Sequence, residues 1–165
     1  MSAYDHSSQV AELTSKVKAI KFAMFTTVDQ YQHLISRPMT CQDIDSDGNL
    51  WFYTSTQADI WENIAAQPDV NLSFSNPEDS VYVSVSGRAE RVVDRAEIKA
   101  RWNPAVQAWF PAGPDDPHAV LIRVVSDTAE YWDSNSSSMV QLYQMAKSVL
   151  TGTKPHDGEH GRLKL

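Results

Sequence analysis

The sequence predicts an α+β domain in which helices flank a small antiparallel β-barrel. Its 165 residues contain about six to seven short runs rich in β-branched and aromatic residues, as barrel strands do. The run "VYVSVS" at residues 81–86 alternates valine with polar or aromatic side chains, the pattern of a half-buried strand. Turn signals beside most runs favour hairpins and hence antiparallel pairing. We expect one domain over residues 1–152 and a polar tail over residues 153–165.

Four helices are expected from apolar spacing and capping residues. Ser7 or Ser8 can cap the first helix, whose apolar residues then recur at helical spacing. Thr56 can cap a short second helix, and Asp94 begins a third that ends before Asn103. The expected helices lie after residue 8 and at residues 57–67, 94–102 and 136–150.

The predicted strands are short, and one of them contains a glycine. Gly87 inside an alternating run indicates a bend or bulge, which barrels need where strands turn. A proline-punctuated loop at residues 106–118 separates the last strands from the rest. The predicted strands lie at residues 21–29, 32–41, 50–55, 70–76, 81–93, 119–126 and 129–134.

The stretch "DIDSDGNLWFYTS" at residues 43–55 begins like the loop of a calcium-binding EF-hand. Such a loop needs a bidentate carboxylate at its twelfth position, and counting from Asp43 places Thr54 there. The residues after Gly48 are bulky and favour a strand over a helix. We therefore predict a hairpin turn at Asp47–Gly48 and no metal site.

Composition narrows the class of protein. The net charge of −7 and the lack of a basic tract disfavour nucleic acid as a partner. No apolar stretch is long enough to span a membrane, and the N-terminus lacks the apolar core of a signal peptide. The single cysteine, Cys41, fits a reducing compartment. We expect a cytoplasmic protein without a membrane partner.

Common catalytic motifs are missing from the sequence. It contains no G-x-G-x-x-G, phosphate-loop lysine motif, G-x-S-x-G or C-x-x-C. His156 and His160 lie four residues apart, but Gly158 and Gly161 disfavour a helix that would bring them together, so we expect a solvated tail. No residue is assigned a catalytic role.

Two short stretches could bind an anion. In "SRPMT" at residues 36–40, Arg37 can either pair with a carboxylate on an edge strand or face an anionic ligand. In "TST" at residues 54–56, hydroxyl groups stand where a strand ends and a helix begins, which suits a helix cap or a bound phosphate. Taken singly, each stretch is explained by the ion pair or the cap.

Together, "SRPM", the hairpin, "LWFYTS" and the following helix resemble the FMN-binding split-barrel family typified by pyridoxamine 5'-phosphate oxidase. Residues 83–133 are similar to the general stress protein branch through the motifs G-x-A, V-x-D-R, W-N-P, W-F-P-x-G and D-D-P. The combination is far more specific than any single motif. The resemblance covers about residues 8–151.

The resemblance implies an antiparallel split β-barrel that forms a homodimer, with one FMN in each of two clefts between the subunits. It implies that the flavin ring and ribityl phosphate are bound by two groups of residues: Ser36, Arg37, Pro38, Met39 and Thr40, and Tyr53, Thr54 and Ser55. Three aromatic residues are candidates to cover the flavin of the partner subunit, with packing in their own subunit as the alternative: Trp102, Trp109 and Phe110.

One position departs from the family pattern. Members commonly carry a phosphate-contacting lysine early in the helix after the Thr-Ser strand end, and counting places Ile60 there. The resemblance implies an FMN-binding general stress protein that buffers flavin or takes part in redox chemistry. The alternatives are a flavin-dependent oxidoreductase, of the pyridoxamine phosphate oxidase or flavin reductase type, and a barrel that has lost flavin and serves as an interaction module. Ile60 favours the last of these.

Overall fold

A computed structural model describes residues 3–134 and 159–165 of the chain. Its helices and strands follow one another in the order α1 (Ala3–Val17), β1 (Phe22–Val28), β2 (Leu34–Thr40), β3 (Asp43–Ile44), β4 (Leu50–Ser55), α2 (Asp59–Ala66), β5 (Asp69–Asn76), β6 (Val81–Val92), α3 (Arg95–Ala100), α4 (Pro104–Trp109), β7 (Ala119–Asp133) and β8 (Glu159–Lys164).

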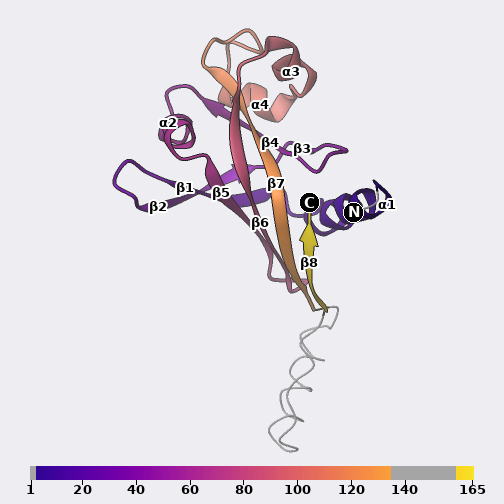
Figure 1. Cartoon of the computed structure of the whole chain (residues 1–165). Helices are drawn as coiled ribbons and strands as arrows, with labels where there is room; N and C mark the ends of the chain where they lie inside the picture. Colours follow the sequence, from indigo (N-terminus) through magenta and orange to yellow (C-terminus); the bar gives the residue numbers. More distant parts are fainter. Residues whose placement is uncertain (1–2, 135–158) are drawn as a thin grey trace, which may run out of the picture.

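All described strands belong to one antiparallel sheet. Its order is β2-β1-β5-β6-β7-β4-β3, and β8 pairs with β7 beside this path. The sheet curls into a half-barrel, with the long strands β6 and β7 running through its middle (Figure 1). Helices α3 and α4 lie at one end of these strands, and α2 lies near the β1–β2 hairpin (Figure 1). The predicted α+β split-barrel class is therefore confirmed.

The core lies on the inner face of the curled sheet, under α1 and α2. Strand β1 alternates as the sequence predicts, with Ala23, Phe25 and Thr27 buried between more exposed neighbours. The rings of Phe25 and Phe52 meet edge to face, with centroids 5.1 Å apart, and join β1 to β4 across the core. Helix α1 contributes Val10, Leu13 and Val17 to buried positions, and α2 contributes Ile60, Trp61 and Ile64.

Gly87 marks the predicted irregularity of β6. The register between β6 and β7 shifts between Ser86 and Gly87. A Cβ atom added at Gly87 would lie 2.3 Å from the carbonyl oxygen of Val125, closer than any side chain tolerates. The bulge prediction is confirmed, because only glycine lets β7 approach this closely.

The D-x-D-x-D-G stretch forms the turn between β3 and β4. The carboxylate of Asp45 accepts hydrogen bonds from the backbone N–H groups of Asp47 and Asn49, both at 3.0 Å, and from Trp51 Nε1 at 2.9 Å. Gly48 has a φ of +82°, the left-handed conformation that the turn prediction requires. This carboxylate organises a hairpin, as predicted.

Several predicted element boundaries are wrong. Helix α1 begins at Ala3, before the predicted caps at Ser7 and Ser8. The two strands predicted at residues 119–134 form the single strand β7. Part of the predicted loop at residues 106–118 lies in α4, because Asn103 accepts hydrogen bonds from two backbone N–H groups and Pro104 fits the first helical position.

Residues 159–164 form a strand that was not predicted from the sequence. Strand β8 lies within the stretch expected to be a polar tail, and it pairs with residues 128–133 of β7. Its backbone reaches α1, where Lys164 N donates to Gln9 Oε1 at 2.8 Å. The helix predicted at residues 136–150 and His156 lie outside the described residues. Within the described ranges, no helix combines the length and apolar character needed to cross a membrane.

Candidate functional site

A cavity of about 600 Å³ lies between the β1–β2 turn and the beginning of α2. Its residues come from three segments that the fold brings together: the turn at Asp29–Tyr31, strand β2, and the stretch that follows β4. Its lining residues are Asp29, Gln30, Tyr31, Ile35, Arg37, Thr56, Gln57, Ala58, Asp59, Glu62, Asn63 and Ala66. We call it the Arg37 cavity.

Arg37 is held by two neighbouring elements. Its Nη1 donates to Thr27 Oγ1 at 2.9 Å, and Thr27 is fully buried on β1. The same hydroxyl accepts a hydrogen bond from Asn63 Nδ2 of α2 at 3.3 Å. Burial lowers the pKa of Arg37 and the nearby Asp59 carboxylate opposes that shift. A guanidinium remains charged even so, and this one presents its charge in a partly desolvated cavity.

The other residues predicted on this strand divide between its two faces, because successive strand side chains point in opposite directions. Met39 lies on the same face as Arg37 and packs against the core. Ser36, Pro38 and Thr40 are exposed on the opposite face, where the Ser36 hydroxyl accepts a hydrogen bond from Thr26 Oγ1 at 3.1 Å. Arg37 alone of the five predicted residues lines the Arg37 cavity.

The predicted residues at the end of β4 have separate roles. Tyr53 donates a hydrogen bond to the Ile98 carbonyl of α3 at 2.5 Å, and burial raises the pKa of Tyr53 to about 12. Thr54 is buried in β4. The Ser55 hydroxyl accepts from Gln57 N at 3.1 Å, which ties the strand end to the cavity wall. None of these three residues is among those that line the Arg37 cavity.

Thr56 does not cap α2, so the predicted cap is wrong. The N-cap residue is Ala58, and its side chain accepts no hydrogen bond. Thr56 instead lies 2.8 Å from His118 through Oγ1 and Nδ1, and its backbone N–H donates to the His118 carbonyl at 3.0 Å. The hydroxyl expected to cap the helix is therefore directed to the loop that precedes β7.

Ile60, at the position where the family pattern leads one to expect a phosphate-contacting lysine, points into the core. Only 2% of its surface is exposed, and it packs with Trp61 and Ile64. It does not line the Arg37 cavity, whereas Gln57, Asp59 and other polar residues around it do. Three carboxylates, Asp29, Asp59 and Glu62, share this lining with Arg37.

The aromatic residues predicted to cover a flavin lie at the α3–α4 end. Trp102 meets Tyr53 edge to face at 5.6 Å and lies 6.2 Å from the ring of Phe110. Trp109 is 85% exposed. None of the three lines the Arg37 cavity of its own chain. Trp102 and Phe110 thus pack largely against residues of their own chain, whereas Trp109 is exposed.

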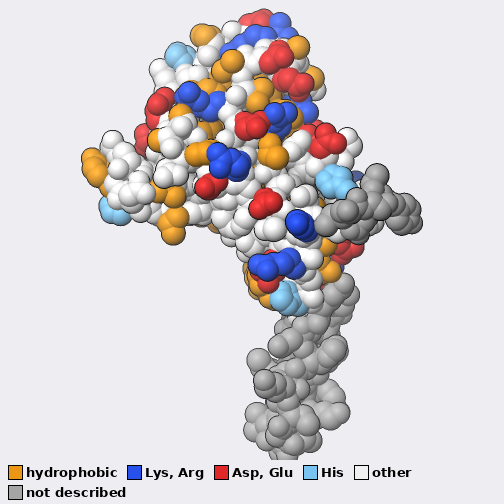
Figure 2. All heavy atoms as spheres, in the orientation of Figure 1, with side chains coloured by type: hydrophobic (Ala, Val, Ile, Leu, Met, Phe, Trp, Pro, Cys, Tyr) orange, Lys and Arg blue, Asp and Glu red, His pale blue; other side chains and the backbone are white. Residues whose placement is uncertain are grey.

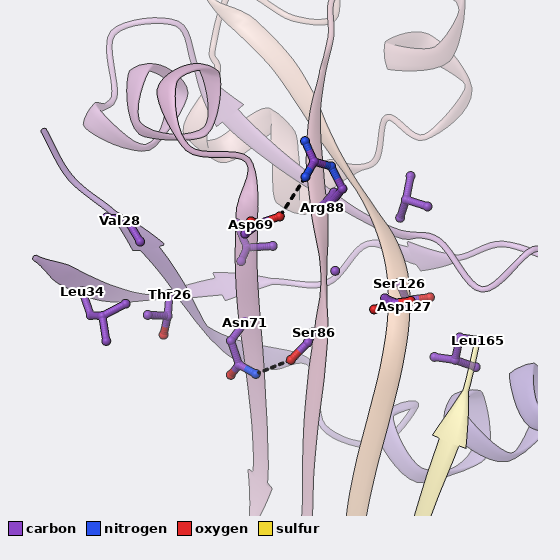
Figure 3. A pocket seen from close by; sticks show the side chains of 13 residues that line it. Thr26, Val28, Leu34, Asp69, Asn71, Ser86, Arg88, Ser126, Asp127 and Leu165 are labelled. Atoms are coloured by element: carbon purple, nitrogen blue, oxygen red, sulfur yellow. Dashed lines mark hydrogen bonds and ion pairs between the residues drawn. The ribbon is translucent and has the colours of Figure 1, made fainter. Parts of the chain in front are cut away.

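A second cavity, of about 860 Å³, lies on the other side of the β1–β2 hairpin (Figure 3). Small polar residues that pair directly across the strands form its floor: Thr26, Asn71 and Ser86. Asn71 donates to Ser86 at 3.3 Å, and Arg88 pairs with Asp69 at 3.0 Å (Figure 3). Leu34 and Leu165 border it on opposite sides (Figure 3). Adjacent residues Leu34 and Ile35 thus face different cavities.

An aromatic group that was not predicted from the sequence lies on the same open face of the sheet. Tyr82 and Trp132 pair across β6 and β7 and are 41% and 43% exposed. The ring of His160 stacks on Trp132, with centroids 5.2 Å apart and an angle of 8° between the planes. The alternation of β6 places Tyr82 outward and could have identified it. His160 could not be placed, because its neighbour on β7 is far away in the sequence.

Known proteins resemble this chain in sequence and in fold. Residues 8–156 match the family described as pyridoxamine 5'-phosphate oxidase like. The chain is 32% identical over 154 residues to protein bli-3 of Neurospora crassa, covering 87% of this chain and 74% of that protein.

Two solved structures share the fold over most of their length. One, from Jannaschia sp. CCS1, carries the provisional name general stress protein 26; it is 26% identical, with a TM-score of 0.73 over 94% of this chain and 99% of that one. The other is the general stress FMN/FAD binding protein of Xanthomonas citri, 29% identical, with a TM-score of 0.68 over 79% and 92%. Because residues 8–156 match this family and the fold is shared with solved structures of similar sequence, the chain belongs to the pyridoxamine 5'-phosphate oxidase-like family.

Proposed function

We propose that the protein binds FMN, with the phosphate in the Arg37 cavity, and serves as a general stress protein that buffers flavin or uses it in redox chemistry. The observation that carries the proposal is the anchored Arg37 guanidinium at the edge of a 600 Å³ cavity. A relative named as FMN/FAD binding, 29% identical, adds support. When bound, FMN supplies hydride and electron chemistry that protein side chains lack.

The donors of the cavity suit a phosphate monoester. Arg37 offers charge-assisted hydrogen bonds, and the amides of Gln57 and Asn63 offer neutral ones. The carboxylates in the lining oppose an anion, so the balance is weaker than in a site with two cations. FMN is therefore expected to bind with moderate rather than extreme affinity.

We further propose that the protein is a homodimer whose flavin lies between the subunits. The open face of the sheet exposes large apolar side chains that share one side by register: Phe22, Met24, Tyr82 and Trp132. Hydrophobic side chains are also exposed near the tip of the β1–β2 hairpin, among them Tyr31 and Leu34 (Figure 2). A patch of this kind on a small domain is typical of a subunit interface.

Equilibrium titration tests the flavin proposal. FMN fluorescence should be quenched saturably at micromolar concentrations, and a matched titration with riboflavin reports the contribution of the phosphate. An unquenched FMN signal up to about 100 μM would refute flavin binding.

Light scattering tests the dimer. Met24→Glu should halve the measured mass, and a monomer mass for the unaltered protein at all concentrations would refute the interface.

One observation favours the interaction-module alternative. Asp29, Asp59 and Glu62 line the Arg37 cavity together with Arg37, which among the described lining residues is the one cation, and Ile60 supplies no charge. A protein that lost flavin would have no need of a cationic phosphate site. A colourless protein whose Arg37→Ala variant behaves identically toward FMN would support that function instead.

A further inference from the structure

His118 lies directly behind Thr56, one of the residues that line the Arg37 cavity. The two side chains are 2.8 Å apart, from His118 Nδ1 to Thr56 Oγ1. Their backbones are also joined, because Thr56 N donates to the His118 carbonyl at 3.0 Å. This contact continues the pairing of β4 with β7 beyond Ser55 and Ala119, the last pair of the ladder. The fold therefore fixes a histidine against the cavity wall.

The loop that carries His118 is itself held on several sides. His118 N donates to Asp116 Oδ1 at 2.8 Å. The Asp116 carbonyl accepts from Arg95 Nη1 at 2.8 Å, and the Pro117 carbonyl lies 3.5 Å from Arg95 Nη2. Although the His118 ring is exposed to solvent, its backbone is anchored to both α3 and β4. Its contact with Thr56 is therefore built into the loop.

We propose that His118 is the second cationic group of the phosphate site and that it acts through the Thr56 hydroxyl. When Nδ1 carries no proton, it accepts the hydroxyl hydrogen of Thr56, which then turns only lone pairs toward the cavity. When the ring is protonated, Nδ1 donates to Thr56 Oγ1 instead, and the hydroxyl hydrogen is free to bond a phosphate oxygen. For a neutral ring whose proton is on Nε2, protonation thus adds a positive charge and a donor together.

This inference rests on the proposed function, since it concerns the phosphate of a flavin in the Arg37 cavity. The lining of that cavity combines Arg37 with three carboxylates, and residue 60 is a buried isoleucine. A second positive charge would therefore favour a bound phosphate. Histidine is the side chain whose charge changes most readily near neutral pH. The preference of the cavity for FMN over riboflavin should therefore strengthen as the pH falls.

Other charged groups surround the pair and must be considered. Asp115 and Asp116 lie on the loop of His118, where Asp115 pairs with Lys99 at 2.9 Å. Arg95 of α3 binds the loop carbonyls. Across the cavity lie Arg37, Asp59 and Glu62, and Asp29 is 3.5 Å from His33. His33 is thus a second histidine close to the cavity, and an experiment has to separate the effects of the two histidines.

The experiment measures the dissociation constants of FMN and riboflavin between pH 5.5 and pH 8.0. The ratio of riboflavin to FMN constants should fall about tenfold from low to high pH in the unaltered protein, equivalent to one lost charged hydrogen bond. The second ionisation of the FMN phosphate, near pH 6, acts in the opposite direction and is common to all variants. His118→Gln should abolish the fall, and Thr56→Val should reduce it.

Two histidine variants serve as controls. His33→Gln and His160→Gln, the latter on β8 and paired with Glu130 at 2.8 Å, should keep the pH dependence of the unaltered protein. If His118→Gln follows the same profile as the unaltered protein, or if His33→Gln removes the fall, the inference is overturned while flavin binding stands.

A second measurement does not depend on flavin. In nuclear magnetic resonance titrations with inorganic phosphate, the titration midpoint of the His118 ring should rise by about half a pH unit or more, and that of His160 should not move. Failure of both flavins to bind, with the phosphate effect present, would reject the flavin function and keep the anion site. An unmoved His118 midpoint at saturating phosphate would reject the role of His118.

Discussion

Arg37 of β2 and Thr27 of β1 are joined by a 2.9 Å hydrogen bond from Nη1 to Oγ1, at the boundary between the core and the Arg37 cavity. Thr27 is fully buried, so its hydroxyl is a fixed acceptor, and Asn63 of α2 donates to the same atom. One buried hydroxyl therefore positions the guanidinium and ties α2 to the sheet. The cavity depends on this contact for its shape as well as its charge.

Arg37→Ala should weaken FMN binding by about 10- to 100-fold, because a hydrogen bond to a charged group contributes about 1.5–3 kcal/mol. Riboflavin, which lacks the phosphate, should lose much less. Fluorescence titrations of both ligands measure the difference. Lys18→Ala removes an equal charge from an exposed site at the end of α1 and should leave both constants unchanged. Equal losses for FMN and riboflavin would show that Arg37 does not face the phosphate.

Ile60→Lys should destabilise the protein by about 3 kcal/mol or more without a gain in FMN affinity, because it places a charge in the core. Gln57→Lys puts the same group on the exposed lining of the Arg37 cavity. It should raise FMN affinity about tenfold at low salt, leave riboflavin unaffected, and lose its effect at high salt. Urea unfolding and flavin titration check the pair. A stable Ile60→Lys protein with tighter FMN binding would contradict the burial of residue 60.

Gly87→Ala should lower the free energy of unfolding by about 2–4 kcal/mol. The new Cβ would lie 2.3 Å from the Val125 carbonyl oxygen, and both contacting groups are backbone, so β6 and β7 would have to separate. Ser86→Ala, next to it and exposed, should cost about 1 kcal/mol at most. Denaturant midpoints measure both changes. Matching midpoints for Gly87→Ala and the unaltered protein would mean that the bulge does not require glycine.

Asp45→Asn should cost about 1–2 kcal/mol at neutral pH, because an amide cannot accept from Asn49 and Trp51 as a carboxylate does. Burial raises the pKa of Asp45, but hydrogen bonds from Trp51 and Asn49 outweigh it and leave the pKa below its usual value. A lowered folded-state pKa stabilises the protein above the unfolded pKa of about 3.9 and ceases to do so as the pH falls through the folded value.

The stability gap between the unaltered protein and Asp45→Asn should therefore close below about pH 4. Thermal unfolding of both proteins between pH 2 and pH 7 measures this difference in stability. Asp47→Asn, at the exposed position of the same turn, should show no such gap. A gap that persists undiminished at pH 2 would rule out the ionised carboxylate as its source.

Cys41 should react slowly with disulfide reagents at neutral pH. Burial raises the pKa of its thiol to about 12, so very little thiolate forms, and Sγ lies 3.5 Å from the Asp43 carbonyl. A thiol assay of the native protein should show a fraction of the rate seen in denaturant. Labelling of the native protein at the rate of a free model thiol would contradict this.

Local patterns were sufficient for much of the fold. The alternation in β1 and β6, the turn at Gly48 and the bulge at Gly87 each follow from the geometry of a few adjacent residues. The merger of two predicted strands into β7 could not be predicted from adjacent residues, because the long strand is paired with β6, β4 and β8. Pairing partners far away in sequence override local breaks.

The site shows the same division. Arg37 could be selected from its place in an apolar strand, and its position in a cavity supports that choice. The role of Thr56 could not, because its partner His118 comes from a loop beyond α4. The inward turn of Ile60 was also hidden, since it depends on which face of a two-turn helix meets the core. Spacing places residues along the chain, whereas packing decides where they point.

The pairing of β4 with β7 has a kinetic consequence. The β1–β2 hairpin that carries Arg37 closes a short loop and can form early, but β4 meets its partner only after α2, β5, β6 and both short helices have been crossed. The two walls of the Arg37 cavity should therefore be completed at different times in folding. The ability to bind a ligand should arise only when β4 pairs with β7. A folding intermediate in which only the β1–β2 hairpin has formed should therefore bind no ligand in this cavity.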